Sequence, residues 1–374
     1  MEIQIREVEG KKDLRTFIYL PEQIHRGHET WVPPIYMDEW TYFNPKKNNA
    51  FSYCDTVLLL AYKNGKAAGR IMGIINSRYN EHRGENTARF GYLESWDDQE
   101  VIEALLGSIE EWAGEKGMSK VVGPYGFSDQ DPEGFLIEGF EYRATIATYH
   151  NFDWMPARVE AAGYTKDIDY VVYKVNMPDE LPELYMKILA RVEKRGEFKI
   201  VEFQKKKEMK PWIKPILGLM NECYMDSNIY GYAPLDEKEM EELAKRYWSI
   251  LDQRFIKTVT KEGEIVAFII GIPDMTEGIQ KARGHLLPFG LFKILRSAKK
   301  TKQLDLLLGA VKEPYRGKGL DVLMGVAMIR SAHGAGMEFV DTHHEMESNL
   351  RVRAEMEKMD GEIYKRYRVF QKEL

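Results

Sequence analysis

Apolar and polar positions follow two periods along the chain. Residues 1–8 alternate between apolar and polar, as in a half-buried strand, and residues 11–26 repeat apolar positions at helical spacing. Further strands are predicted at Thr56–Tyr62, Ala67–Ile75, Thr87–Glu94, Lys120–Val122, Ala144–Tyr149 and Asp169–Val175, and helices at Gln99–Lys116 and Trp154–Ala162. Asn64-Gly65 joins the first two of these strands by the tight turn of a hairpin.

The same order of elements recurs after residue 178. A connecting helix is predicted at Pro182–Arg195, followed by Phe198–Gln204 as a strand and a hairpin at 255–272. Helices are also predicted at Met209–Tyr224 and Glu237–Leu251. The remaining elements are a strand Gln303–Val311, a helix Leu320–Ala335, a strand Phe339–His343, a helix Asn349–Lys358 and a strand Ile363–Lys372. We therefore expect an α/β (α+β) protein with two tandem domains, 1–178 and 197–374, joined by a helix within 179–196.

Composition narrows the class of protein. The 374 residues are 44% hydrophobic and 30% charged, which is typical of a globular chain, and the net charge of −6 offers no positive field for nucleic acid. Two cysteines, Cys54 and Cys223, are too few for a disulfide framework or a thiolate metal site. The charged N-terminus and the lack of a long apolar run predict a cytoplasmic protein without stable membrane insertion. We expect a monomer or a homodimer.

One segment carries chemistry. Residues 304–320, LDLLLGAVKEPYRGKGL, run from an apolar strand through a basic, Gly-rich turn into a helix. Such a turn presents backbone N–H groups and the positive end of the helix dipole to an anion. Gly317 and Gly319 permit close approach, and Arg316 and Lys318 add charge. Taken alone, this turn is more often a solvated loop; its place between a strand and a helix favours a pyrophosphate site.

In this context the chain resembles the GNAT superfamily of N-acetyltransferases. Residues Arg316 to Leu320 are similar to its R-x-x-G-x-G/A pyrophosphate loop, with Asp321 in place of the last small residue. The resemblance implies acetyl-CoA or another acyl-CoA as the cofactor, bound by Val311, Arg316, Gly317, Lys318, Gly319, Leu320 and Asn349. Val311 matches the place of a backbone donor, and Met356 stands where the family often has a tyrosine acid.

The resemblance extends over the whole chain. The motifs WVPP at 31–34, GRI at 69–71, GPYGFS at 123–128 and YKRYRVFQK at 364–372 are similar to those of bacterial proteins with two acetyltransferase-like domains. The N-terminal half has no Gly-rich loop before its helix Gln99–Lys116; it has the acidic turn Glu94-Ser95-Trp96-Asp97-Asp98, which repels a pyrophosphate. We therefore expect the coenzyme A site in the C-terminal half alone.

Transfer of an acyl group to an amine requires a base, and the candidates are His343, His344 and Glu345. The alternative is that these three residues form a solvated loop, where adjacent polar residues after a strand are common. Asn221, Tyr224, Tyr230 and Tyr367 are expected at the acceptor site. The segment 123–140, with Ser128, Asp129, Asp131 and Glu133, is either a lid that contacts a cationic amine or a structural connection.

The segment HLLPFGLFKILRSAKKTK at 285–302 mixes apolar and basic residues, which suits a membrane surface or a partner helix; we expect an inserted helix packed over the hairpin and the domain boundary. The predicted function is transfer of an acetyl group from acetyl-CoA to a primary amine of a small molecule or peptide. Two alternatives stay open: a non-catalytic acyl-CoA-binding or sensory protein, and an aminoacyl transferase of the same fold.

Overall fold

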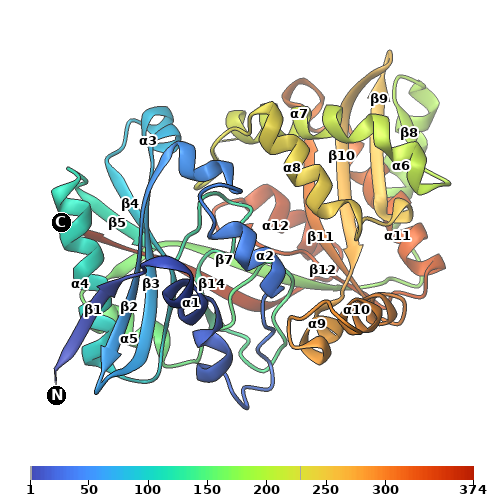
Figure 1. Cartoon of the computed structure of the whole chain (residues 1–374). Helices are drawn as coiled ribbons and strands as arrows, with labels where there is room; N and C mark the ends of the chain where they lie inside the picture. The colour runs from blue at the N-terminus through green and yellow to red at the C-terminus, as the bar shows by residue number, and fades with distance from the viewer. Residues whose placement is uncertain (1, 228) are drawn as a thin grey trace.

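The computed structural model describes residues 2–227 and 229–374. Twelve strands follow one another across both halves of the molecule in the order β1-β2-β3-β4-β5-β14-β7-β12-β11-β10-β9-β8 (Figure 1). Most neighbours are antiparallel; β4–β5 and β11–β12 are parallel pairs. The predicted fold class is confirmed: two α/β units in tandem, each a mixed and mostly antiparallel sheet flanked by helices.

The N-terminal half contains the first seven strands. Its elements are β1 (Ile3–Glu7), α1 (Gly10–Ile24), α2 (Tyr36–Tyr42), β2 (Cys54–Lys63), β3 (Lys66–Asn76), α3 (Ser77–Arg83), β4 (Thr87–Ser95), α4 (Gln99–Glu115), β5 (Lys120–Gly123), β6 (Phe135–Glu138), α5 (Met155–Ala161) and β7 (Thr165–Asn176). Helices α4 and α5 pack on one face of the sheet through a cluster that includes Leu105 and Val159. Helices α1 and α2 cover the other face through Phe17 and Tyr36.

The C-terminal half repeats this plan. Its elements are α6 (Glu183–Arg195), β8 (Lys199–Val201), α7 (Lys210–Asp226), α8 (Glu237–Trp248), β9 (Ile256–Lys261), β10 (Glu264–Pro273), α9 (Thr276–Ala282), α10 (Gly290–Ala298), β11 (Gln303–Val311), α11 (Leu320–Gly334), β12 (Phe339–Asp341), β13 (Glu345–Met346), α12 (Leu350–Lys358) and β14 (Glu362–Glu373). Helices α7 and α8 cover one face through Met220 and Leu243. Helices α6 and α11 cover the other through Leu189 and Val326.

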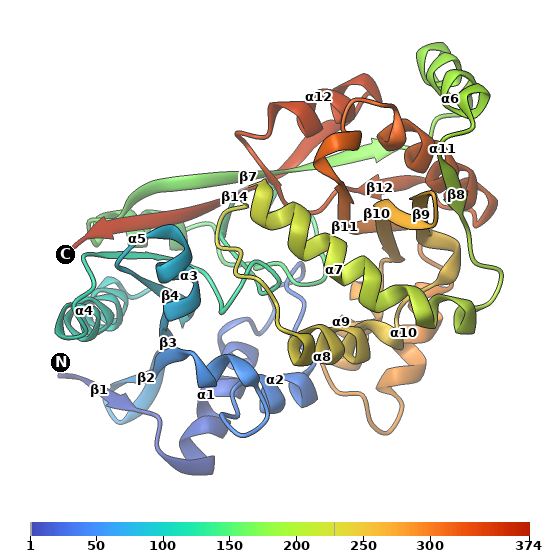
Figure 2. The same ribbon diagram turned by 90° about the horizontal axis from the view of Figure 1, so that it is seen from above.

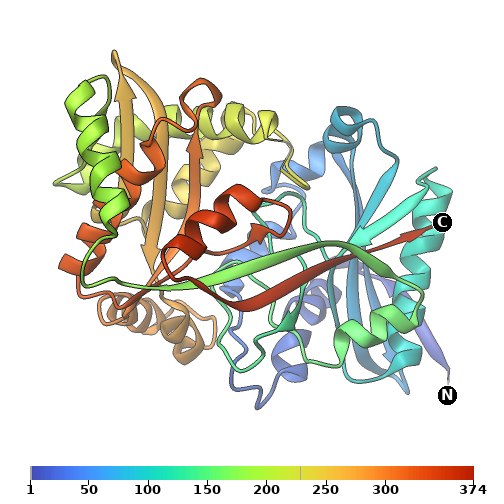
Figure 3. The ribbon, with the colours of Figure 1, turned by 180° about the vertical axis from the view of Figure 1, so that it is seen from behind.

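The two halves exchange their closing strands. Strand β7, at the end of the N-terminal half, pairs with β12 of the C-terminal half (Phe339↔Asn176), and β14 pairs with β5 of the N-terminal half (Phe370↔Gly123). The two long strands also pair with each other, and they run side by side across the junction in Figures 2 and 3. This pairing joins the two sheets into one.

Buried charges lie where the exchanged strands meet β11 and β12. Lys365 Nζ on β14 lies 3.7 Å from Asp341 Oδ2 at the end of β12, and both side chains are almost fully buried. The Tyr364 hydroxyl donates a hydrogen bond to the same carboxylate. Burial, together with Asp341 and Asp274, raises the pKa of Asp305 on β11 well above its usual value. These groups fix the point from which β11 and β12 run apart.

The structure corrects one sequence prediction and refines two others. Residues 144–149, expected to be a strand, form a turn-containing loop, because Ala144 N bonds to Thr30 O and the polar side chains cap local turns. The segment 123–140 contains the strand β6, which pairs with β14. The segment 285–302 is helical only at α10. Among the described residues, no helix is long and apolar enough to cross a membrane.

Candidate active site

Strands β11 and β12 are hydrogen-bonded to each other only over the first three residues of β11. The parallel register runs from Gln303↔Phe339 to Asp305↔Asp341, the whole length of β12, and from Leu306 to Val311 the only described strand that pairs with β11 is β10. The chain after β12 turns towards β7 instead, since Thr342 N donates to Tyr173 O at 3.0 Å. A cavity of about 880 Å³ lies where the two strands diverge.

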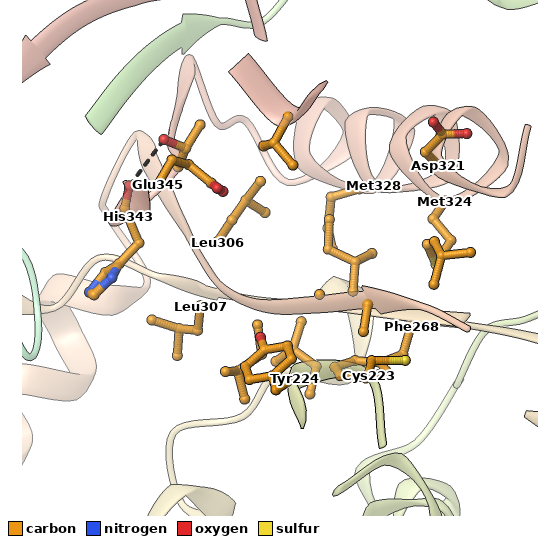
Figure 4. A pocket seen from close by; sticks show the side chains of 18 of the residues that line it. Cys223, Tyr224, Phe268, Leu306, Leu307, Asp321, Met324, Met328, His343 and Glu345 are labelled. Carbon is orange, nitrogen blue, oxygen red and sulfur yellow. Dashed lines mark hydrogen bonds between the residues drawn. The ribbon is translucent and has the colours of Figure 1, made fainter. Parts of the chain in front are cut away.

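The cavity wraps around β11. Figure 4 shows Leu306, Met324, Met328 and Glu345 on one side of this strand, and Leu307, Tyr224, Cys223 and Phe268 on the other. Methionines of α11 and α12 wall the first side, and aromatic and aliphatic side chains of α7, α8 and β10 wall the second. Both sides are largely apolar, so the cavity suits a ligand with a long hydrocarbon portion.

The Gly-rich turn borders one end of the cavity. Arg316, Gly317, Leu320 and Asp321 line it there. Helix α11 has Gly319 as its N-cap, in the left-handed region at φ 85°, and no side chain caps its first turn. The first N–H groups of α11 are therefore left for a ligand, and the helix dipole favours an anion beside them.

The arginine and the lysine of this turn, Arg316 and Lys318, differ in placement. Arg316 Nε donates to Val311 O at 3.0 Å, and its second guanidinium nitrogen donates to Ser227 Oγ at 2.9 Å, which holds the guanidinium at the end of β11. Lys318 instead lies over the ring of Tyr315, 5.2 Å from its centre, and is not part of the cavity wall. Gly319 faces α6, where an added Cβ would lie 2.8 Å from Ile188.

The three candidate bases line the opposite end of the cavity, and their environments separate them. Burial and the neighbouring histidine lower the pKa of His343 to about 4, and burial lowers that of His344 to about 3, so both rings are neutral at physiological pH. Burial raises the pKa of Glu345 to about 8. A base works best with a pKa near the working pH, which favours Glu345 over either histidine.

The histidines hold this end of the cavity together. His343 has a positive φ of 59°, its backbone N–H donates to Asp341 Oδ1 at 2.7 Å, and its Nε2 lies 2.8 Å from Ile146 O. The ring of His344 packs against Tyr367, with 4.3 Å between ring centres. These contacts link β12 to the N-terminal half and fix the backbone from which Glu345 extends.

Acidic residues of the N-terminal half complete the polar end. Asp129, Asp131 and Glu133, on the segment that follows β5, line the cavity beside His344. Burial raises the pKa of Glu133 to about 7, and burial with the neighbouring carboxylates raises that of Asp129 well above its usual value. Closely spaced acids in a buried site are the arrangement that a cationic ligand would stabilise.

Three polar atoms at this end are buried without a hydrogen-bond partner among the described residues. They are Asp129 Oδ1, Gln130 Nε2 and His344 Nε2, all on residues that line the cavity. Asp131 differs, because its carboxylate accepts from the Tyr42 hydroxyl at 2.8 Å and from Phe127 N at 2.8 Å. Asp131 thus shapes the segment, whereas Asp129 and Gln130 present unused polar atoms to a ligand.

The other predicted site residues are divided. Val311, Tyr224 and Asn349 line the cavity, and Asn349 also caps α12 by accepting from Val352 N at 3.4 Å. Asn221, Tyr230 and Tyr367 are not part of its wall. Asn221 instead binds the backbone of Leu235, and Tyr230 donates to Asp167, so both stabilise the loop after α7.

Sequence reasoning missed most of the apolar wall. Met324 and Met328 stand one turn apart on α11, and Met356 of α12 and Met359, the residue that follows this helix, also line the cavity. Their spacing is also that of ordinary core residues, so the sequence alone does not distinguish a wall from a core.

The fold of the chain is that of the GNAT proteins in tandem arrangement. A tandem GNAT protein from the clavulanic acid biosynthesis pathway superposes with a TM-score of 0.55 at 12% identity, covering 100% of this chain and 98% of that one. The resemblance predicted from the sequence is thus confirmed at the level of the fold.

Two curated proteins are similar over almost their full length. A bacterial ceramide synthase of Caulobacter vibrioides is 27% identical over 380 residues, covering 100% of this chain and 98% of the synthase. Protein YghO of Escherichia coli is 25% identical over 379 residues, covering 99% of this chain and 95% of that protein. No family model matches the chain.

Proposed function

We propose that the protein is an acyl-CoA-dependent N-acyltransferase whose active site is the cavity between β11 and β12. The observation that carries this proposal is the continuity of the cavity: it runs from the uncapped start of α11, along the unpaired edge of β11, to the buried carboxyl of Glu345. A nucleotide anion, an extended amide chain and a reacting amine would each meet a matching surface in that order.

The donor end fits coenzyme A. Between Leu306 and Val311 the side of β11 that faces away from β10 is bonded to no strand in the described residues. Side chains of these described residues reach the backbone there only at Gly309, which bonds to Tyr224, and at Val311, whose carbonyl accepts from Arg316, so the intervening N–H and C=O groups can pair with the amides of pantetheine. The first turn of α11 and Arg316 would hold the pyrophosphate. Coenzyme A supplies the acyl group as a thioester, an acyl donor with a good leaving group.

Glu345 is the base in this proposal. An ammonium group enters the polar end and gives one proton to the Glu345 carboxylate; the neutral nitrogen attacks the thioester carbonyl carbon, and the C–S bond breaks with its electron pair on sulfur. The nitrogen loses a second proton as the amide forms, and the thiolate takes up one proton. A bound ammonium lowers the pKa of Glu345 below its value in the empty site, which increases the carboxylate fraction.

The walls favour a long-chain amine and a long-chain acyl group. The cavity extends into the apolar cores on both sides of β11, next to side chains such as Met328 and Phe268, whereas its acids lie at one end. An amine with a hydrocarbon tail would match both the apolar walls and the acidic end. One relative is named a ceramide synthase, a name that denotes the joining of a long-chain amine to an acyl chain. Acetyl-CoA, the donor expected from the sequence, carries no hydrocarbon chain that could contact these apolar walls.

The test is a release assay for free coenzyme A with acetyl-CoA and palmitoyl-CoA as donors and a long-chain amino alcohol as acceptor. Turnover is expected with palmitoyl-CoA and far less with acetyl-CoA. Glu345→Gln is expected to lower kcat by about 10²–10⁴-fold with little change in donor affinity. The matched control is Glu347→Gln, two residues along, whose carboxylate pairs with Lys166 and Arg366 outside the cavity wall.

Two results would overturn the assignment. Full activity of Glu345→Gln would remove Glu345 as the base. Tight acyl-CoA binding without turnover across amine classes would instead favour the acyl-CoA-binding protein, the alternative that the absence of a tyrosine at Met356 keeps open.

A further inference from the structure

The segment between β10 and β11 presents an apolar surface to solvent. Helix α10 packs closely on α9, since a Cβ added to Gly278 would lie 2.6 Å from Ile294 Cα. Only Gly290 and Ile294 of α10 are buried. The outward residues are largely exposed: Leu287 80%, Phe289 71%, Leu291 50%, Phe292 67% and Leu295 46%.

This cluster is unusual within the molecule. Five of the twelve exposed large hydrophobic side chains of the described residues fall between 287 and 295. In Figure 1, α9 and α10 lie at the lower edge of the C-terminal half, with no other helix or strand outside them. An apolar patch of this kind on a soluble surface usually marks an interaction site.

Positive charge surrounds the patch. Residues 278–302 contain seven Lys and Arg and no Asp or Glu, in a chain whose net charge is −6. Lys281 pairs with Glu277 and Lys302 with Glu338. Arg283, Arg296, Lys299 and Lys300 have no ion-pair partner among the described residues, and all four are exposed. The basic groups thus flank the exposed apolar side chains and are available to an anionic surface.

We propose that residues 285–300 attach the protein to the surface of an anionic lipid bilayer. Apolar side chains that enter the acyl region, flanked by cations at the level of the headgroups, are the combination that interfacial helices use. A symmetric dimer through this patch would bring two sets of cations together without counter-charges, which argues against a second copy as the occupant. The attachment lies on the surface and crosses no bilayer.

The location is consistent with the site. Helices α9 and α10 connect β10 to β11, and these two strands wall the proposed active-site cavity. The proposal does not depend on the proposed function, because vesicle binding is measured without acyl-CoA, acceptor or turnover.

The experiment is co-sedimentation of the full-length protein with vesicles of phosphatidylcholine alone, or with about one third phosphatidylglycerol. We expect the protein to bind the anionic vesicles and to bind vesicles of phosphatidylcholine alone much more weakly. Added salt should weaken the binding to the anionic vesicles. The triple variant Leu287→Ser/Phe289→Ser/Phe292→Ser is expected to lose at least about tenfold in vesicle affinity. Lys299→Glu/Lys300→Glu is expected to lose affinity for the anionic vesicles only.

The matched control is Met37→Ser/Leu184→Ser, which removes exposed apolar side chains elsewhere (58% and 54% exposed) and should leave vesicle binding unchanged. Thermal unfolding of each variant checks that the fold is intact. No binding to anionic vesicles, or equal binding by the triple serine variant, would overturn the proposal. Self-association that the triple serine variant abolishes, without vesicle binding, would assign the patch to a second copy and would also overturn it.

Discussion

The two halves place the same elements around two different interiors. Strands β4 and β11 are each nine residues long, and each pairs with the following parallel strand over three residues, Thr87–Arg89 and Gln303–Asp305. In the N-terminal half the next residue is bonded at once, since Phe90 O accepts from Tyr125 N at 2.8 Å. In the C-terminal half the chain after β12 turns away, and the space beside Leu306 stays open.

The helices that follow these strands differ in the same way. Asp98 caps α4, accepting from Val101 N at 3.4 Å, and also pairs with Lys63 at 2.6 Å. Helix α11 begins at Gly319, which has no side chain to offer. The N-terminal half thus satisfies its strand edge and its helix start from within, whereas the C-terminal half leaves both for a ligand. The N-terminal half also contributes Asp129 and Glu133 to the wall of the cavity.

Separating the halves is the largest perturbation. A fragment of residues 1–178 lacks β14, which lies between β5 and β7 in the sheet. We expect this fragment to be insoluble or unfolded, because both strands would lose their hydrogen-bonded neighbour. Co-expression with residues 179–374 should restore a soluble complex, as gel filtration would show. A soluble monomeric fragment 1–178 with native-like circular dichroism would contradict the strand exchange.

Matched truncations on β4 and β11 should differ strongly in cost. Phe90→Ala is expected to lower the free energy of unfolding by about 3–5 kcal/mol, because Phe90 is fully buried in a packed core. Leu306→Ala should lower it by less than about 2 kcal/mol, because Leu306 already borders the cavity. Urea unfolding of both variants measures the difference. Equal costs would mean that the cavity is not open in solution.

Charge reversal at the two helix starts tests which half binds coenzyme A. Arg316→Glu is expected to weaken acyl-CoA binding by about 10–100-fold, and Lys318→Glu by less, because Lys318 rests on Tyr315 away from the cavity. Asp98→Ala should leave binding unchanged and cost about 1 kcal/mol of stability from the lost cap. Calorimetric titration with acyl-CoA measures all three. Unchanged affinity in Arg316→Glu would remove the pyrophosphate site from α11.

The smallest effect is the pH dependence of stability that Glu345 contributes. The pKa of Glu345 is about 8 in the folded protein and lies near 4.5 when unfolded, so the folded state binds more protons between these values. Its contribution to stability is present below about pH 4.5 and is lost as the pH rises through 8. The slope is at most about 1.4 kcal/mol per pH unit, reduced because the side chain borders a solvated cavity.

Glu345→Gln should flatten the dependence of unfolding free energy on pH, as denaturant titrations at pH 5 to 9 would show. In the wild-type protein, kcat/KM should rise towards pH 8 as the Glu345 carboxylate forms. A pH dependence of stability identical in the variant and the wild type would contradict the assigned pKa.

Much of the candidate site followed from local pattern. The strand, basic turn and helix at 303–335 are consecutive in the chain, so Val311, Arg316 and Gly317 are brought together by local structure alone. The acceptor residues are distant in sequence, and there prediction was weaker: Asn221 and Tyr230 hold a loop, while the cavity wall takes Asp129 and Gln130 from the other half. Residues 144–149 show the same limit, since their alternation predicts a strand that no neighbouring edge accepts.

The sequence by itself determined the two-fold repetition of elements, the fold class and the position of the basic, Gly-rich turn, because each depends on periodicity or on glycine and charge within one short segment. Only the tertiary structure decided the exchange of β7 and β14 and the open space beside Leu306. It also decided that the pKa of Glu345 is raised while the pKa values of His343 and His344 are lowered. These depend on which strand edge a segment finds and on how much solvent a carboxyl group loses, and both are set by residues far away in the chain.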